Sequence, residues 1–199
     1  MFTGLIETKG KILEISKTAE GCIFTIEYFF PNNDLKTGDS ICVNGTCLTV
    51  TEFDETKMKF YASYQTLKLT NLGKLEVNSF VNLERSMLPS SRMGGHIVSG
   101  HVDAVGTILE RIEKDGGNTY QFFVEIPTEF SKYIATRGSV TVDGISLTVV
   151  SVEHNRFELV LIPETMKKTN ASDWQKGSLV NLEIDLIARY VERLLEFSK

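Results

Sequence analysis

The feature that most constrains the fold of this chain is an internal repeat. Three pairs of stretches carry it: ICVNGTCLTVT (41–51) with VTVDGISLTVV (140–150), VNLE (81–84) with VNLE (180–183), and TGLIETKGKI (3–12) with SGHVDAVGTI (99–108). The first two pairs are offset by 99 positions and the third by 96, in the same order along both halves. A period this long does not fit a solenoid repeat. The sequence therefore predicts a duplicated domain of roughly 90 residues.

Each half has the pattern of a small antiparallel barrel. Short runs rich in β-branched and aromatic residues, such as FTIEYFF (24–30) and KMKFYAS (57–63), alternate with turn residues. The Asn-Gly of 44–45 and the Asp-Gly of 143–144 are strong hairpin signals. We therefore expect an all-β fold of two barrels. Two short helices are expected, at 129–134 and 165–168, and a connector at 86–95.

The last residues have a different period. In the stretch 186–199, apolar residues recur at helical spacing: Ile187, Tyr190, Val191, Leu194 and Leu195. The pattern predicts a C-terminal amphipathic helix that serves as an oligomerisation element, and the alternative is a helix docked on its own domain. The expected domains are residues 1–96, 97–185 and 186–199.

Composition narrows the classes of function. A net charge of −5 without a lysine or arginine run argues against nucleic-acid binding. We see no signal-peptide pattern and no apolar run that could span a bilayer, so a cytoplasmic protein without a membrane partner is expected. Three cysteines without a C-x-x-C pair indicate a reducing compartment. His96 and His101 are five positions apart and no third ligand is evident, so no metal site is predicted.

The two halves differ in their reactive groups. His101, Asp143 and Asp185 in the second half correspond to poorer acids or bases in the first: Leu5, Asn44 and Ser86. Cys47 corresponds to Ser146. The frame is therefore repeated while its polar atoms are changed.

Six motifs together resemble riboflavin synthase: MFTGLIE (1–7), GDSICVNGTCLTV (38–50), GGHIVSGHVDAVG (94–106), VDGISLTVV (142–150), LIPET (161–165) and VNLEID (180–185). The resemblance implies two six-stranded barrels and a helix, assembled as a homotrimer with active sites between barrels of different chains. It implies a transferase that moves a four-carbon unit between two molecules of 6,7-dimethyl-8-ribityllumazine, giving riboflavin and 5-amino-6-(D-ribitylamino)uracil. No metal or organic cofactor is implied, and lumazine synthase is a candidate partner.

The reaction requires loss of a ring-methyl proton, addition of a nucleophile, and close stacking of two rings. The resemblance implies catalytic roles for six residues: Phe2, Cys47, His101, Asp143, Ser146 and Asp185. It implies substrate contacts at a larger set: Gly4, Leu5, Ile6, Ser40, Leu48, Thr49, Ser63, Thr66, Gly100, Val102, Arg137, Leu147, Thr148, Ile162, Pro163, Glu164 and Thr165. Among these, Gly4 and Gly100 are expected to let the backbone approach a flat ring.

Five of the catalytic candidates also have simpler explanations. Cys47 could be a small buried hydrophobe in a strand. Asp143 precedes a glycine, as a hairpin turn requires. Asp185 could only cap the last helix. His101 could be a surface histidine in a turn, and Phe2 could merely anchor the terminus.

The resemblance has departures and one main rival. The first half has YQTL (64–67) where an acid is expected, the second has TNASDW (169–174), and Arg137 stands where lysine is more usual. The rival is a non-catalytic lumazine- or flavin-binding protein of the same fold, such as the lumazine protein of luminous bacteria. A hydride-transferring flavoenzyme is disfavoured, because no G-x-G-x-x-G follows a strand.

Overall fold

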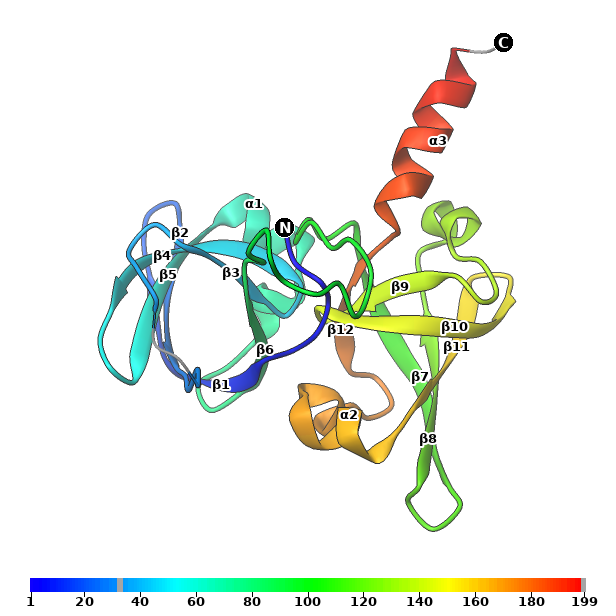
Figure 1. Ribbon diagram of the computed structural model, residues 1–199, viewed down its shortest axis with the longest axis horizontal. Helices are drawn as coiled ribbons and strands as arrows, with labels where there is room; N and C mark the ends of the chain where they lie inside the picture. The colour runs from blue at the N-terminus through cyan, green and yellow to red at the C-terminus, as the bar shows by residue number, and fades with distance from the viewer. Residues whose placement is uncertain (32–33, 198–199) are drawn as a thin grey trace.

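A computed structural model describes residues 1–31 and 34–197 as two closed six-stranded barrels with a projecting C-terminal helix (Figure 1). The first barrel consists of β1 (Thr8–Lys17), β2 (Gly21–Glu27), β3 (Ser40–Val43), β4 (Thr46–Phe53), β5 (Lys57–Ser63) and β6 (Phe80–Arg85). The second consists of β7 (Ala104–Lys114), β8 (Thr119–Glu125), β9 (Ser139–Val142), β10 (Ile145–Glu153), β11 (Arg156–Leu161) and β12 (Leu179–Glu183). All pairings between these strands are antiparallel, which confirms the all-β, two-barrel prediction.

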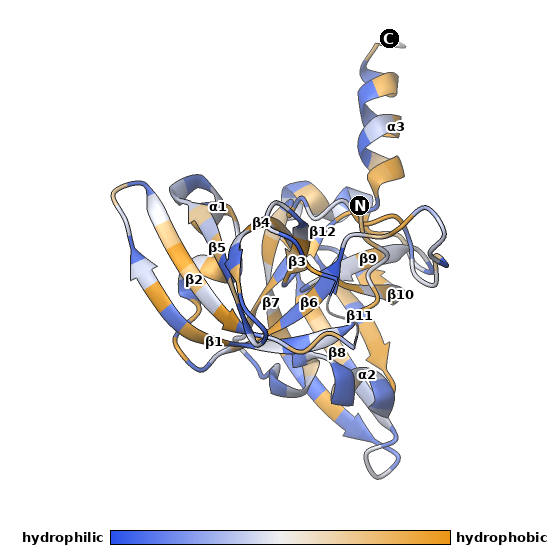
Figure 2. Cartoon of the chain, turned by 60° about the vertical axis from the view of Figure 1, so that its left-hand side comes forward, coloured by the Kyte–Doolittle hydropathy of each residue, from blue (hydrophilic) through white to orange (hydrophobic). Residues whose placement is uncertain are grey.

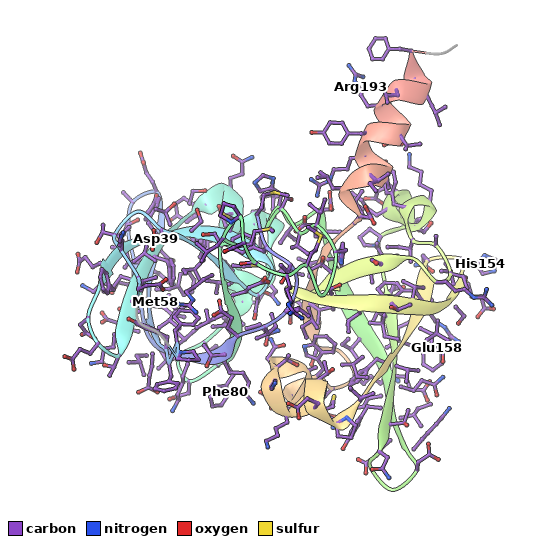
Figure 3. The ribbon with its side chains drawn as sticks, viewed as in Figure 1. Asp39, Met58, Phe80, His154, Glu158 and Arg193 are labelled. Carbon is purple, nitrogen blue, oxygen red and sulfur yellow. The ribbon has the colours of Figure 1, made fainter. Side chains whose placement is uncertain are left out.

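The two barrels have the same strand order. The first runs β1-β2-β5-β4-β3-β6 around its circumference, and the second runs β7-β8-β11-β10-β9-β12. Each barrel encloses its own apolar core, with Met58 and Phe60 fully buried in the first and Phe122 and Phe157 in the second. The label of Met58 falls within the first barrel (Figure 3). The two halves of the sequence repeat therefore fold into two barrels that have the same topology and separate cores.

The hairpin turns follow from left-handed backbone positions. Asn44 has φ 45° and Gly45 has φ 79°, and Asp143 and Gly144 have φ 46° and 82°. Two consecutive positive φ angles define the turn that matches the twist of a two-residue hairpin. Asparagine, aspartate and glycine tolerate this region best. The predicted turns at 44–45 and 143–144 are therefore confirmed.

Short helices close the end of each barrel. They are α1 (Tyr64–Leu69), η1 (Asn71–Lys74), η2 (Thr128–Tyr133), α2 (Pro163–Lys168) and η3 (Asn170–Asp173), the η elements being 3₁₀ turns. The helices expected at 129–134 and 165–168 correspond to η2 and α2. The sequence prediction missed α1, although the Ser63 hydroxyl that accepts from the Thr66 amide is an N-cap signal.

The segments that lead into the barrels are exchanged between them. Residues 1–7 precede β1 and residues 96–103 precede β7; we call these the leading segments. Phe2 forms an antiparallel bridge with Val98, so the two segments lie side by side. Figure 1 shows the N-terminal stretch and the connector passing between the barrels.

A buried cluster of polar side chains joins the barrels. We call it the amide network, and its members are Asn44, Asn71, Asn82, Asp143, Asn170 and Asn181. Asn82 Nδ2 donates to the carbonyl of Asp143 at 2.8 Å, and Asn181 Nδ2 donates to the carbonyl of Asn44 at 2.7 Å. These two bonds are equivalent under the repeat, so the barrels are related by an approximate twofold axis.

The helix α3 (Leu186–Glu196) extends away from the second barrel (Figure 1). Its base is held by polar contacts, because Arg189 Nη2 lies 2.7 Å from Asp103 Oδ2, and Glu192 contacts Lys132 and Tyr133. Figure 2 shows apolar (orange) and polar (blue) residues mixed along this projecting helix. Ile187 and Leu194 are each 68% exposed. Residues 198–199 of the expected 186–199 segment lie outside the described residues.

Among the helices described, none is long and apolar enough to cross a membrane.

Candidate functional site

A cavity of about 250 Å³ lies on the outer side of the first barrel, beside β4 and α1. It is lined by Thr46, Cys47, Ser63, Gln65, Thr66, Leu69, Thr70, Gly100, His101 and Val102. Six of these were sequence candidates, and we call them the first-barrel site: Cys47, Ser63, Thr66, Gly100, His101 and Val102. Residues from β4, α1 and the second leading segment thus meet at one cavity.

Strand alternation places Cys47 in this cavity. Along β4, Leu48 and Val50 point into the barrel, whereas Cys47 is half-buried and Thr49 is exposed. Side chains two positions apart share one face of a strand, so Cys47 and Thr49 both lie outside the barrel. The Cys47 thiol is therefore accessible from the cavity, and the expectation of a merely buried hydrophobe is not met.

Gly100 brings the leading segment onto β4. Its carbonyl accepts a hydrogen bond of 2.8 Å from the Cys47 amide. A Cβ on Gly100 would lie 2.6 Å from the Cβ of Cys47, and φ is +79°. Gly4 is the counterpart, with φ +75°, and a Cβ there would lie 2.5 Å from the Cβ of Ser146. Both glycines therefore permit close approach of a neighbouring strand, and their expected approach to a ligand ring stays a prediction.

The equivalent positions in the second barrel form a matching arrangement. We call them the second-barrel site: Gly4, Leu5, Ile6, Ser146, Ile162, Glu164 and Thr165. The Ser146 amide donates to the Gly4 carbonyl at 2.8 Å, as Cys47 does to Gly100. Ser146 and Thr148 share the outer face of β10, as predicted. Residues 4–6 thus accompany the second barrel and residues 100–102 the first.

The sequence analysis missed His96 as a partner of Ser146. His96 Nδ1 lies 2.7 Å from Ser146 Oγ, and Nε2 lies 3.2 Å from Thr141 Oγ1. Burial lowers the pKa of the His96 imidazole, while the charge of Asp185 acts in the opposite direction. A neutral imidazole can accept a proton at one nitrogen while the other donates. The signal in the sequence is the histidine of GGHIVSG. In the sequence analysis, its spacing from His101 argued only against a metal pair.

The first-barrel site has sulfur where the second has oxygen. Cys42 is paired with Cys47 across β3 and β4, as Thr141 is with Ser146 across β9 and β10. Burial raises the pKa of the Cys42 thiol well above its usual value, so Cys42 stays protonated. Phe2 is fully buried and packs with Cys42 and Val98. Phe2 therefore anchors the N-terminus behind Cys47 and does not line the cavity, and its expected catalytic role stays a prediction.

Asp143 belongs to the amide network. Its carboxylate accepts from the Asn181 amide at 2.7 Å, Asn71 Nδ2 at 2.9 Å, Asn170 Nδ2 at 3.1 Å and Trp174 Nε1 at 3.2 Å. Burial raises its pKa to about 7 despite these four donors. Asp143 is absent from the cavity that holds Cys47. The structure thus places Asp143 in the turn and the barrel interface, and its expected catalytic role stays a prediction.

Asp185 and His101 lie where α3 begins. The Asp185 carboxylate accepts from the Ile187 amide at 2.9 Å, so it caps the helix as the simpler explanation held. It also acts electrostatically on His96. His101 is exposed at the cavity, and its carbonyl accepts from Arg189 at 2.8 Å. Asp185 and His101 each make a contact that holds α3 in place, and each also lies near a site.

The remaining candidates lie around the two sites. Ser40 pairs with Thr49, and it lines a neighbouring cavity of about 540 Å³ together with Leu5. Thr148 is exposed and Ile6 packs against the second core. Pro163 occupies the first turn of α2, beside the exposed Ile162 and Glu164 and the half-buried Thr165.

Three candidates differ from the others in their burial or backbone conformation. Leu48 is buried in the first core and the half-buried Leu147 packs against the second, and their expected ligand contacts stay predictions. Arg137 is exposed and has φ +66°, where the first half has Gly38. A non-glycine residue in that region costs conformational energy, which is often tolerated at functional positions.

Among residues 1–31 and 34–197, no cluster of three or more His, Cys, Asp or Glu side chains could hold a metal ion.

Comparison with known proteins identifies the domain and the family. A sequence profile of the lumazine binding domain matches residues 3–86 and again 99–185, so the protein is a tandem lumazine-binding protein. Riboflavin synthase of Actinobacillus pleuropneumoniae is 44% identical over 195 residues, 98% of this chain and 90% of its own. Riboflavin synthase of Photobacterium phosphoreum is 43% identical over 202 residues, 100% of this chain and 91% of its own. The chain belongs to the riboflavin synthase family.

A solved relative has the same architecture. The structure of LumP complexed with riboflavin superposes with a TM-score of 0.83 at 25% identity. The match covers 92% of this chain and 99% of LumP.

Proposed function

We propose that this chain is a transferase that converts two molecules of 6,7-dimethyl-8-ribityllumazine into riboflavin and 5-amino-6-(D-ribitylamino)uracil. The observation that carries the proposal is the pair of equivalent sites with different reactive groups. Two identical substrates need similar frames, and opposite roles in the reaction need different polar atoms. No cofactor is part of the proposal.

The second-barrel site supports a proton-transfer role. The Ser146 hydroxyl can donate to His96, whose lowered pKa keeps the imidazole neutral and able to accept a proton. Thr141 then stabilises the opposite nitrogen. We propose that Ser146 and His96 together accept the proton that a ring methyl loses.

The first-barrel site supports a nucleophilic role. Cys47 presents its thiol to the cavity, and His101 and Thr66 line the same cavity. A thiol is a better nucleophile than a hydroxyl at neutral pH. We propose that Cys47 adds to, or directly contacts, one of the two rings. Arg137, Thr49 and Thr148 are proposed to bind the substrate from the exposed outer faces.

Apolar side chains of α3 are exposed in the single chain. Ile187, Tyr190 and Leu194 are exposed on α3. This supports the proposed homotrimer, with helices from three copies in contact and the sites completed between subunits. The cysteines are unpaired, which supports a cytoplasmic location. Association with lumazine synthase stays a prediction.

The primary experiment supplies the purified protein with 6,7-dimethyl-8-ribityllumazine alone. We expect riboflavin to form at half the rate at which the lumazine disappears, as absorbance and chromatography measure. The second candidate is a non-catalytic flavin- or lumazine-binding protein, favoured by the similarity to LumP with riboflavin. Bound lumazine that is never converted would establish that second candidate instead.

Two substitutions test the assigned groups. Cys47→Ala and Ser146→Ala are each expected to lower kcat by about 10²-fold or more, since each removes a reacting group. Cys22→Ala is the matched control, because Cys22 is a buried thiol of the first core outside both sites. Full turnover in both site variants would show that neither group is essential.

A further inference from the structure

Two buried glutamates occupy equivalent places at the ends of β6 and β12. Glu84 is 4% exposed and Glu183 is 2% exposed. They are the last residues of the two VNLE motifs. The proposed reaction does not use either carboxylate. Buried carboxylates are costly unless they are hydrogen-bonded, so their partners indicate their role.

Each carboxylate binds one leading segment through three hydrogen bonds. Glu84 accepts from the Thr3 amide and Thr3 Oγ1, both at 2.7 Å, and from the Gly4 amide at 3.0 Å. Glu183 accepts from the Ser99 amide at 2.7 Å, Ser99 Oγ at 2.6 Å and the Gly100 amide at 3.0 Å. The two sets match atom for atom.

The opposite edge of each leading segment contacts a reactive residue. The Gly4 carbonyl accepts from the Ser146 amide, and the Gly100 carbonyl accepts from the Cys47 amide. Each glycine therefore lies between a glutamate of one barrel and the site strand of the other. Glu84 is in the first barrel but holds a segment of the second-barrel site. Glu183 is in the second barrel but holds a segment of the first-barrel site.

We infer that Glu84 and Glu183 are positioning residues that act crosswise, Glu183 for the first-barrel site and Glu84 for the second-barrel site. This inference rests on the proposed function for the identity of the two sites. Through Gly100, Glu183 sets the distance of His101 and Val102 from Cys47. Through Gly4, Glu84 sets Leu5 and Ile6 beside Ser146. The duplicated VNLE motif is thus required for ligand geometry as well as for the barrel.

A carboxylate suits this role better than an amide. Both oxygens accept, and together they receive two backbone amides and one hydroxyl. Glutamine has the same shape, but its NH₂ group would face an amide donor. Glu183→Gln and Glu84→Gln therefore weaken the hold on one leading segment each while keeping the volume of the core.

The test uses Cys47 as a reporter in the full-length chain. Iodoacetamide labelling of Cys47 is followed by mass spectrometry, in the presence and absence of riboflavin. We expect labelling to be about fivefold faster in Glu183→Gln, as loss of roughly one net hydrogen bond predicts. Riboflavin should protect Cys47 less in this variant. Glu84→Gln should leave the labelling rate of Cys47 and its protection by riboflavin within about twofold of the wild type. This variant loses an equivalent hydrogen bond, but at the other leading segment.

The difference between Glu183→Gln and Glu84→Gln decides whether the crosswise assignment holds. Equal effects on Cys47, or no effect in either, would overturn the crosswise assignment. If Glu183→Gln does not fold, Ser99→Ala and its counterpart Thr3→Ala remove one hydroxyl from each set and give the same contrast. Because labelling needs no turnover, a chain that never forms riboflavin would contradict the proposed function while the positioning test still stands.

Discussion

At the scale of single residues, equivalent positions of the repeat have different side chains with different chemistry. A thiol at position 47 is intrinsically nucleophilic, whereas a hydroxyl at position 146 needs a base. His96 is hydrogen-bonded to Ser146, whereas His101 lines the cavity beside Cys47. The difference between Cys47 and Ser146 is therefore accompanied by a difference in their surroundings. This supports distinct roles for the two sites.

Asp143 gives a prediction of pH-dependent stability. Its folded-state pKa of about 7 is raised from the ordinary value, so folding favours the protonated carboxyl. Its contribution is fully present below about pH 4 and is lost as the pH rises through 7. We expect Asp143→Asn to abolish this part of the pH dependence. Urea unfolding of both proteins between pH 5 and pH 8 measures the difference.

The control for this prediction is Asp115→Asn in the exposed turn between β7 and β8, where φ is 52°. That variant should keep the wild-type slope, because Asp115 is solvated. An unchanged slope in Asp143→Asn would mean that Asp143 does not titrate in this range.

At the scale of elements, strands and helices contribute differently to the two sites. The strands present reactive groups on their outer faces, while α1 and α2 border the two sites. The helix α3 is different, since none of its residues is buried and polar contacts of Arg189 and Glu192 hold its base. An 11-residue helix with an exposed apolar face is marginal alone, so packing against another chain is the expected source of its stability.

This role of α3 predicts a change in assembly. The double variant Ile187→Glu/Leu194→Glu places charge on the exposed apolar face and should convert the proposed trimer into the 22.3 kDa single chain. The barrels should unfold at nearly the wild-type temperature, because neither residue belongs to a barrel core. Sedimentation velocity measures the mass. Arg193→Gln is the control, since Arg193 is an exposed polar residue of the same helix (Figure 3).

An unchanged mass in the double variant would show that α3 does not hold the assembly together.

At the scale of the whole molecule, polar contacts couple the barrels. The two apolar cores are separate, and the amide network and exchanged leading segments bridge them. Buried amides are directional, so they fix one relative orientation of the barrels more strictly than apolar contact would. The approximate twofold symmetry of these bonds gives both sites the same backbone frame.

Removing one amide should weaken both barrels together. Asn82 is fully buried and donates to the Asp143 carbonyl and to Asn170. We expect Asn82→Ala to lower the free energy of unfolding by about 1–3 kcal/mol, because buried partners lose their bonds. Equilibrium urea unfolding measures it. Asn118→Ala is the control in an exposed turn and should change stability by less than about 0.5 kcal/mol.

A stability loss confined to one barrel, seen as two separate unfolding transitions with only one shifted, would contradict this coupling.

The local features of the fold were predictable from the sequence. The repeat predicted the duplication, and Asn-Gly and Asp-Gly predicted the two hairpin turns. Six of the ten residues that line the first-barrel cavity were also predicted, through motifs and their resemblance to a family. The expected boundary after residue 96 stays a prediction, because the leading segments contact both barrels.

The tertiary structure alone decided which distant groups meet. Nothing near Glu183 in the sequence indicates that it binds Ser99, 84 positions earlier, or that His96 faces Ser146 across 50 positions. Asp143 was predicted as catalytic because its type and motif suggested chemistry, yet its donors come from residues up to 72 positions away. Periodicity and turn preference act between near neighbours, so the sequence by itself determined the barrels. Hydrogen bonds between distant segments form only once the barrels pack, so the assembly of the sites was decided by the tertiary structure.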